Sequence, residues 1–128
     1  MAVHVIVVDD QEPFRVTAAS VAEATEGFEL VGTVETAEES VAAVAALAPD
    51  LVPMDVNLPG MDGLAATRLL RVSGAVSSVV LMSSYDADRY ADVATECGAI
   101  GYLTKVDLDP DGLQAVWDRG RRRPGPST

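Results

Sequence analysis

The stretch LVPMDVNLPGMDG, residues 51–63, decides how the rest of this chain is interpreted. It opens with a short apolar run, reaches the carboxylate of Asp55, and then passes twice through Pro and Gly turn formers. Such a run followed by turn formers is typical of a buried strand that enters a loop. In open α/β sheets, ligands bind at the carboxyl ends of the strands, which is where Asp55 lies. Asp55 is therefore a candidate reacting group or metal ligand, and the alternative is an ordinary loop acid.

Four other segments resemble the apolar run before Asp55 and are rich in β-branched residues, which favour strands. They cover residues 3–8, 28–34, 79–82 and 100–104, and segments with apolar residues at helical spacing separate them. Strands that alternate with helices predict right-handed crossovers and a parallel sheet covered on both faces. We expect an α/β fold with a doubly wound five-stranded parallel sheet in the order 2-1-3-4-5, as in flavodoxin. Its switch point places the first and third strands side by side.

The predicted helices have recognisable ends. Thr36, followed three residues later by Glu39, is typical of a capping box, and Pro49 ends that helix. Asp86 is a candidate cap of the helix before the fifth strand, and Asp109 of the last helix.

Two aromatic residues lie on apolar helix faces. Phe14 recurs at helical spacing with Thr17, Ala18 and Val21, which predicts a helix there. Trp117 lies on the apolar side of the last helix, where core packing is favoured over a partner surface.

Composition indicates one ordinary globular domain. The chain has 128 residues, of which 48% are hydrophobic and 23% charged. No apolar run approaches the ~20 residues that cross a bilayer, and no export signal opens the chain. The single Cys97 cannot form an internal disulfide, which favours a reducing compartment. We therefore expect a cytoplasmic protein.

The net charge of −11 is unevenly distributed. Residues 1–118 hold all 20 acidic groups, whereas residues 119–128 are rich in Arg, Pro and Gly. We expect a folded domain over 1–118, followed by a tail or the stub of a linker. An acidic domain repels nucleic acid, whose binding depends on phosphate neutralisation, so direct DNA binding by this domain is not expected.

The other predicted strand ends carry polar groups that complement Asp55. Strand 1 ends in Asp9 and Asp10, strand 4 in Ser83, and strand 5 in Lys105. Two carboxylates ~4 Å apart repel by about 4 kcal/mol at an effective dielectric near 20, so three of them require cations. Lys105 supplies one positive charge, and oxygen ligands without His or Cys favour Mg²⁺ or Mn²⁺. A carboxylate beside such a cation and an ammonium can attack a phosphoryl group.

Four motifs carry a resemblance to a known family. They are VVDD at 7–10, MDVNLPGMDG at 54–63, LMSS at 81–84 and GAIGYLTK at 98–105. Over residues 3–118 the chain resembles the receiver domain of a two-component response regulator, and its fifth-strand motif resembles receivers of LuxR/NarL-type transcription factors. That resemblance implies a phosphorylation-dependent signalling switch that is not an enzyme beyond its own phosphorylation and dephosphorylation.

The resemblance also implies roles for the site residues. Asp55 is then the phosphoacceptor, which takes its phosphoryl group from a sensor histidine kinase. Mg²⁺ is held by Asp10, Asp55 and the backbone carbonyl of Asn57, with Asp9 acting through water. Lys105 pairs with the acyl phosphate.

The same resemblance implies how the signal leaves the site. Ser83 moves to bond the phosphoryl group, and Tyr102 turns inward as the aromatic switch. An ordinary amphipathic strand position is an equally good interpretation of Tyr102. The switching surface is helix 4, strand 5 and helix 5, which also offers a homodimer interface. Output is expected to be transcription control through a DNA-binding domain outside this chain.

Two residues depart from the family pattern. Pro53 lies in a predicted central strand, where it removes a ladder N–H, so we expect local unpairing, a bulge or a bound water there. Val106 follows Lys105 where many receivers have a cis proline, and a cis bond to a non-proline costs ~2.5–4 kcal/mol.

Two other functions remain open from the sequence. A small phosphohydrolase with an Asp nucleophile would use the same groups, but Asn57 occupies the position where such enzymes place a general acid. A receiver-like interaction module that works without phosphorylation is the other, and Pro53 is the feature that favours it.

Overall fold

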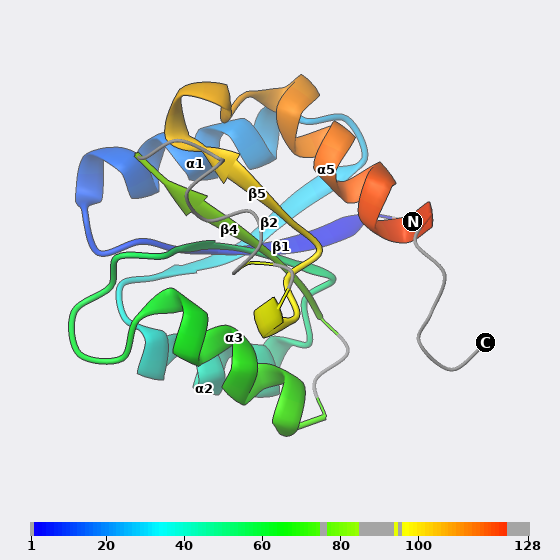
Figure 1. Ribbon diagram of the computed structural model, residues 1–128. Helices are drawn as coiled ribbons and strands as arrows, with labels where there is room; N and C mark the ends of the chain where they lie inside the picture. Colours follow the sequence, from blue (N-terminus) through cyan, green and yellow to red (C-terminus); the bar gives the residue numbers. More distant parts are fainter. Residues whose placement is uncertain (1, 75–76, 85–93, 95, 123–128) are drawn as a thin grey trace.

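The computed structural model describes residues 2–74, 77–84, 94 and 96–122 (Figure 1). Every predicted strand is present, with ends within one residue of the prediction. The helix expected after Asp86 lies largely outside the described residues. In chain order the elements are β1 (Val3–Val8), α1 (Glu12–Ala24), β2 (Phe28–Val34), α2 (Ala37–Leu47), β3 (Leu51–Asp55), α3 (Gly63–Val72), β4 (Ser78–Ser83), β5 (Gly101–Thr104), a 3-10 turn (Lys105–Asp107) and α5 (Pro110–Arg122).

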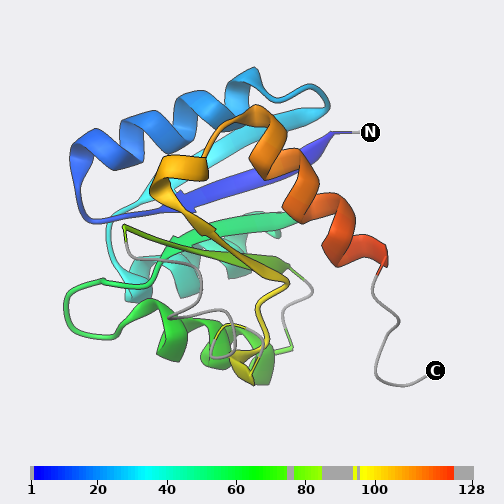
Figure 2. The ribbon, with the colours of Figure 1, turned by 45° about the horizontal axis from the view of Figure 1, so that its top comes forward.

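The sheet has the predicted topology. Its strands run in the order β2-β1-β3-β4-β5, and all four pairings are parallel. Helices α1 and α5 lie on one face and α2 and α3 on the other (Figures 1 and 2). All carboxyl strand ends therefore meet at one edge, as the doubly wound fold requires.

Side chains alternate between two hydrophobic clusters, one on each face of the sheet. Ile6 and Met54 belong to the cluster under α2 and α3, whereas Val5 and Leu51 belong to the cluster under α1 and α5. This is the period of two expected of strands buried on both faces. Trp117 is half-buried, packs against the second cluster and meets Phe28 edge-on at 6.4 Å between ring centroids. Core packing is thus the role the structure supports for Trp117.

The predicted caps at Thr36 and Asp109 form, and the Asp86 cap lies outside the described residues. The Glu39 N–H donates to Thr36 Oγ1 at 3.0 Å. The Glu39 carboxylate accepts from the Glu35 N–H at 3.3 Å and from the Thr36 hydroxyl at 3.2 Å, instead of from the Thr36 backbone N–H. At α5, the Gly112 N–H donates to Asp109 Oδ1 at 2.7 Å. Helix α5 continues through Arg122, beyond the expected domain end at 118. Where the tail begins stays a prediction.

Pro53 interrupts one side of β3. Partners with β4 are continuous from Leu51 to Asp55, and Pro53 itself faces Val80. Partners with β1 are recorded only at Leu51 and Met54, on either side of Pro53, with the same offset. The lost ladder contact is therefore on the β1 side, and the constant offset means local unpairing instead of a bulge.

No helix in the described ranges is long and apolar enough to cross a membrane.

Candidate functional site

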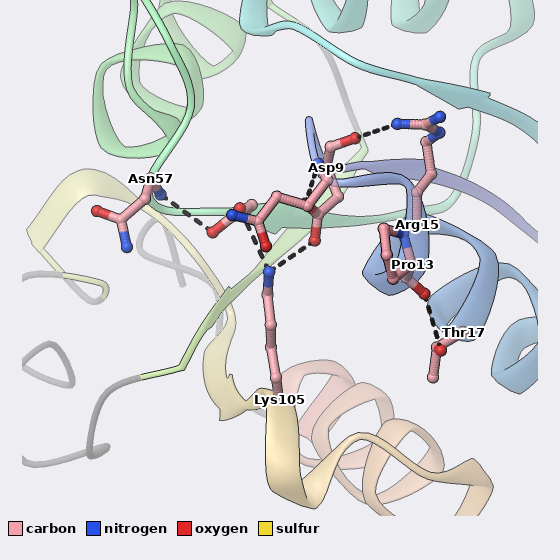
Figure 3. Close-up of polar contacts among 8 residues, drawn as sticks. Asp9, Pro13, Arg15, Thr17, Asn57 and Lys105 are labelled. Atoms are coloured by element: carbon pink, nitrogen blue, oxygen red, sulfur yellow. Dashed lines mark hydrogen bonds and ion pairs between the residues drawn. The ribbon is translucent and has the colours of Figure 1, made fainter.

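Three of the predicted residues form a buried ion-pair cluster at the carboxyl edge of the sheet. Lys105 Nζ lies 2.8 Å from Asp9 Oδ2 and 3.4 Å from Asp55 Oδ2. The three side chains are almost wholly buried, at 7%, 1% and 5% exposure. Figure 3 shows the Lys105 side chain reaching toward Asp9 from the end of β5. Residues far apart in the sequence therefore meet because β1, β3 and β5 end at one edge.

Asp9 is fixed by hydrogen bonds and an ion pair. The Gln11 N–H donates to Asp9 Oδ1 at 2.9 Å, and Arg15 Nη1 donates to the Asp9 backbone oxygen at 2.9 Å. The other carboxylate oxygen, Oδ2, is buried and forms the ion pair with Lys105, but it accepts no hydrogen bond from the described residues. A buried anionic oxygen in this condition has capacity for a further positive partner.

Asp55 is not fully neutralised by its surroundings. Burial raises the pKa of Asp55 from 3.8 to about 6, and repulsion by Asp9 adds to that rise. The backbone N–H of Asn57, at 3.1 Å from Asp55 Oδ1, and the Lys105 ammonium act in the lowering direction. Burial outweighs them, so the pKa of Asp55 lies close to neutral pH. Asp55 is therefore a carboxylate above about pH 6, and a further cation nearby would favour that charged form.

The carboxylates form a credible metal site. One oxygen each from Asp9, Asp10 and Asp55 lies within 4.8 Å of the others. Asp9 and Asp55 are buried whereas Asp10 is exposed, so the cluster opens to solvent on the Asp10 side. Hard carboxylate oxygens without His or Cys among them suit Mg²⁺. The residues present fit the ion.

The loop after Asp55 folds back beneath it. The Gly63 N–H donates to the Val56 carbonyl at 3.0 Å, and Asp62 caps α3 by accepting from the Ala65 N–H at 2.8 Å. A methyl group at Gly63 would overlap the Asp55 backbone oxygen. The glycine at the end of the opening motif is therefore required by close backbone approach.

Ser83 and Tyr102 lie where the prediction placed them along the strands. Ser83 is fully buried at the end of β4, one residue beyond the partner of Asp55. Tyr102 is half-buried in β5 and packs against the cluster under α2 and α3. Their movement on phosphorylation stays a prediction. The side chain of Asn57 is exposed, and its backbone N–H already supports Asp55.

The sequence interpretation missed two residues of the site. Arg15 binds the Asp9 backbone and also pairs with Glu35 at 3.4 Å, so it connects the ends of β1 and β2. The Phe14 ring centroid lies 4.0 Å from Lys105 Nζ, and Phe14 is 37% exposed. Phe14 shares the helical spacing of Ala18, which is buried, but the Phe14 ring contacts Lys105. Their only sequence signal was proximity to Asp9 and Asp10.

Val106, which takes the place of the proline found after the lysine in many receivers, follows an ordinary trans peptide bond. Among the described residues no peptide bond is cis, so the bond between Lys105 and Val106 is trans. Val106 is 88% exposed.

Comparisons with known proteins agree with this geometry. Residues 5–117 match the family model described as the response regulator receiver domain. The chain is 36% identical over 114 residues to the response regulator GacA of Pseudomonas viridiflava, covering 89% of this chain and 53% of that protein. It is 32% identical over 111 residues to the transcriptional regulatory protein DegU of Brevibacillus brevis, covering 87% of this chain and 47% of that protein. The chain thus spans about half the length of these relatives.

Solved structures show the same relationship. The signal receiver domain of the putative response regulator NarL from Mycobacterium tuberculosis is 27% identical, with a TM-score of 0.86 and coverage of 95% of this chain and 98% of that one. A two-component response regulator of the LuxR family from Aurantimonas sp. SI85-9A1 is 30% identical, with a TM-score of 0.85 and coverage of 96% and 88%. Receiver domains act generally as phosphorylation-dependent switches and generally bind Mg²⁺ at an acidic pocket. With its acidic cluster, its lysine and a family match over 5–117, this chain belongs to the response regulator receiver domain family.

Proposed function

We propose that Asp55 is the phosphoacceptor of this receiver domain and takes its phosphoryl group from a phosphohistidine of a sensor kinase. The observation that carries the proposal is the placement of Asp55, buried beside Lys105 and within 4.8 Å of two further carboxylates. Burial, with repulsion from Asp9, raises the pKa of Asp55 to about 6, and a nearby cation would favour its charged form. An incoming divalent cation supplies that positive charge.

The transfer uses the groups already in contact. A carboxylate oxygen of Asp55 forms the new bond to phosphorus while the bond from phosphorus to the histidine nitrogen breaks, and the imidazole leaves. Lys105 stays within 3.4 Å of the Asp55 carboxylate and balances charge on the phosphoryl oxygens. The buried hydroxyl of Ser83 turns to donate to a phosphoryl oxygen. The product is an acyl phosphate on Asp55.

Mg²⁺ would be held by Asp10, by Asp55 and by the backbone carbonyl of Asn57, with Asp9 acting through water. When bound, the ion neutralises charge on the phosphoryl oxygens during transfer. Asp10 is the exposed member of the cluster, which suits a first point of capture. The Arg15 contact fixes the backbone of Asp9 so that the cluster is formed in advance.

Output then follows from movement of Ser83 and Tyr102. We place the responsive surface on β5, α5 and the helix predicted after Asp86, which lies largely outside the described residues. The same surface is the proposed homodimer contact. The name of the relative DegU supports control of transcription as the output, exerted by a DNA-binding domain beyond this chain. We also propose a cytoplasmic location and no catalytic turnover beyond self-phosphorylation and dephosphorylation.

The experiment is incubation with acetyl phosphate and Mg²⁺, followed by intact-mass measurement. The wild-type protein should gain about 80 Da, the mass of one phosphoryl group, and Asp55→Asn should gain nothing. Glu23→Gln, an exposed carboxylate on α1, serves as the matched control and should be phosphorylated normally. Phosphorylation that persists in Asp55→Asn would show that another residue accepts the group. Continuous turnover of phosphomonoesters would identify a hydrolase instead.

A further inference from the structure

The position of Phe14 is not explained by packing in the core. It lies four residues before the buried Ala18 on α1, yet it is 37% exposed. Neither hydrophobic cluster of the described residues includes it. Single exposed apolar residues are common on protein surfaces, so the exposure of Phe14 by itself assigns it no role. Its recorded contact is with the Lys105 ammonium, at 4.0 Å from the ring centroid.

The Lys105 ammonium is surrounded by three partners. Asp9 and Asp55 attract it from one side, at 2.8 and 3.4 Å. The Phe14 ring lies over the same nitrogen, at a distance suited to a cation–π contact. Lysine has a flexible four-carbon stem and a point charge, so an ammonium held by carboxylates alone keeps freedom to turn away. A ring over the ammonium removes part of that freedom.

The backbone that carries the Phe14 ring has a defined position, because its neighbour Arg15 is held by several contacts. The Arg15 backbone N–H donates to the Gln11 carbonyl at 2.9 Å, and its guanidinium binds the Asp9 backbone at 2.9 Å and Glu35 at 3.4 Å. The first turn of α1 therefore has a defined position relative to Asp9. Phe14, one residue before Arg15, is carried by the same rigid turn.

We propose that Phe14 is a positioning residue for phosphoryl transfer: its ring holds the Lys105 ammonium toward Asp9 and Asp55 through a cation–π contact. It does not touch the reacting atoms and acts through Lys105. The inference rests on the proposed role of Asp55 and adds a residue to it. A ring-free apolar side chain of similar size should keep the fold but let the ammonium explore other positions. Phosphoryl transfer should then slow, because fewer molecules have Lys105 in place.

The contact can be observed directly, because the chain contains no other lysine. Labelling lysine with ¹³C at Cε yields one side-chain signal, whose protons are displaced by the ring current of Phe14. Phe14→Leu should move that signal toward the position of a free lysine, and Phe14→Tyr should leave it displaced. A lysine signal unchanged in Phe14→Leu would overturn the contact.

The role is tested by the rate of phosphorylation with acetyl phosphate and Mg²⁺. Phe14→Leu should be about fivefold slower, the size of effect expected from a partly desolvated cation–π contact. Phe14→Tyr should recover to within about twofold of the wild type, since it keeps the ring. Phe14→Met is a second ring-free variant and should match Phe14→Leu. Val16→Ala, which alters an exposed apolar residue of α1, is the control and should not change the rate.

Two rate results would overturn the proposal: Phe14→Leu as fast as the wild type, or Phe14→Tyr as slow as Phe14→Leu. A wild-type protein that accepts no phosphoryl group contradicts the proposed function instead. In that case the lysine signal still decides whether Phe14 holds Lys105.

Discussion

Asp55 and Asp9 both pair with the single ammonium of Lys105, so among the described residues the two negative charges are balanced by only one positive charge. Lys105 pairs with both carboxylates in a setting where each side chain is at most 7% exposed. Removing one partner from such a buried group costs about 3–5 kcal/mol, because the remaining charge is left uncompensated. With two buried carboxylates and one lysine, part of the negative charge is uncompensated even in the wild-type protein. Burial raises the pKa of Asp55 to about 6, and repulsion by Asp9 adds to that rise.

Asp55→Asn should therefore stabilise the metal-free protein at pH 7.5. The pKa of Asp55 is about 6 in the folded state against 3.8 for the free group, so the folded protein binds the proton more tightly than the unfolded chain. Above pH 6 the buried carboxylate costs stability, by up to about 3 kcal/mol at 1.36 kcal/mol per pKa unit. Below pH 3.8 both states are protonated and the cost vanishes. Thermal unfolding should show the stability difference between variant and wild type shrinking as pH falls from 6 to 4.

The control for this pH dependence is Asp111→Asn, an exposed carboxylate on α5. Its thermal midpoint should follow the wild type across the same range. A difference between Asp55→Asn and wild type that stays constant from pH 7.5 to 4 would contradict a raised pKa as the cause.

At the scale of elements, β3 lacks one ladder contact, on the side that faces β1. Pro53 leaves a gap in pairing with β1 while the ladder to β4 is intact. Pro53→Leu restores an N–H that can donate toward β1. Satisfying a buried carbonyl with such a donor contributes about 1–3 kcal/mol to stability. The change also gives the unfolded chain more freedom, which costs about 0.4–1 kcal/mol. The first effect is larger, so we expect a net gain of about 1 kcal/mol in the free energy of unfolding, measured with urea.

Pro13→Ala is the matched control for Pro53→Leu. Pro13 is exposed in the first turn of α1, where a helix needs no N–H. Its replacement should leave the free energy of unfolding unchanged or slightly lower. If Pro53→Leu also fails to raise that energy, the gap beside β1 is not a source of instability.

The loop between β3 and α3 depends on Gly63. Gly63→Ala would place a methyl group against the Asp55 backbone oxygen, so the loop must shift. Overpacking of this kind costs about 1–3 kcal/mol and would also move Asp55 away from Lys105. We expect slower phosphorylation together with lower stability. Gly32→Ala is the control, because its methyl group would meet Leu47 and Ile6 at ordinary distances of 3.7 and 3.9 Å.

For the whole molecule, the acidic edge of the sheet links metal binding to folding. The unfolded chain separates Asp9 and Asp10 from Asp55, so Mg²⁺ binds the folded state and stabilises it by about 2.7 kcal/mol at 100 times its dissociation constant. Asp10→Asn should remove most of the Mg²⁺-dependent rise in the thermal midpoint. Asp50→Asn, an exposed acid at the opposite end of β3, should retain it. A rise of equal size in both variants would indicate nonspecific binding.

Much of this architecture was accessible from the sequence. Strand positions, the parallel order 2-1-3-4-5, the Thr36 and Asp109 caps and the meeting of Asp9, Asp55 and Lys105 all followed from local patterns. Apolar periodicity and turn residues are local properties, and a parallel sheet brings every strand end to one edge. Residues at strand ends are therefore neighbours as soon as the topology is known.

The tertiary structure alone decided what depends on where an element lies relative to another. Phe14 has the spacing of a core residue, but the start of α1 overhangs the sheet edge, so the ring covers Lys105. Arg15 reaches the Asp9 backbone for the same reason. The side of β3 that Pro53 leaves unpaired likewise required the register of both neighbours. Periodicity states which face of a helix is apolar, whereas only the packed position of that helix determines whether the face meets the core or the site.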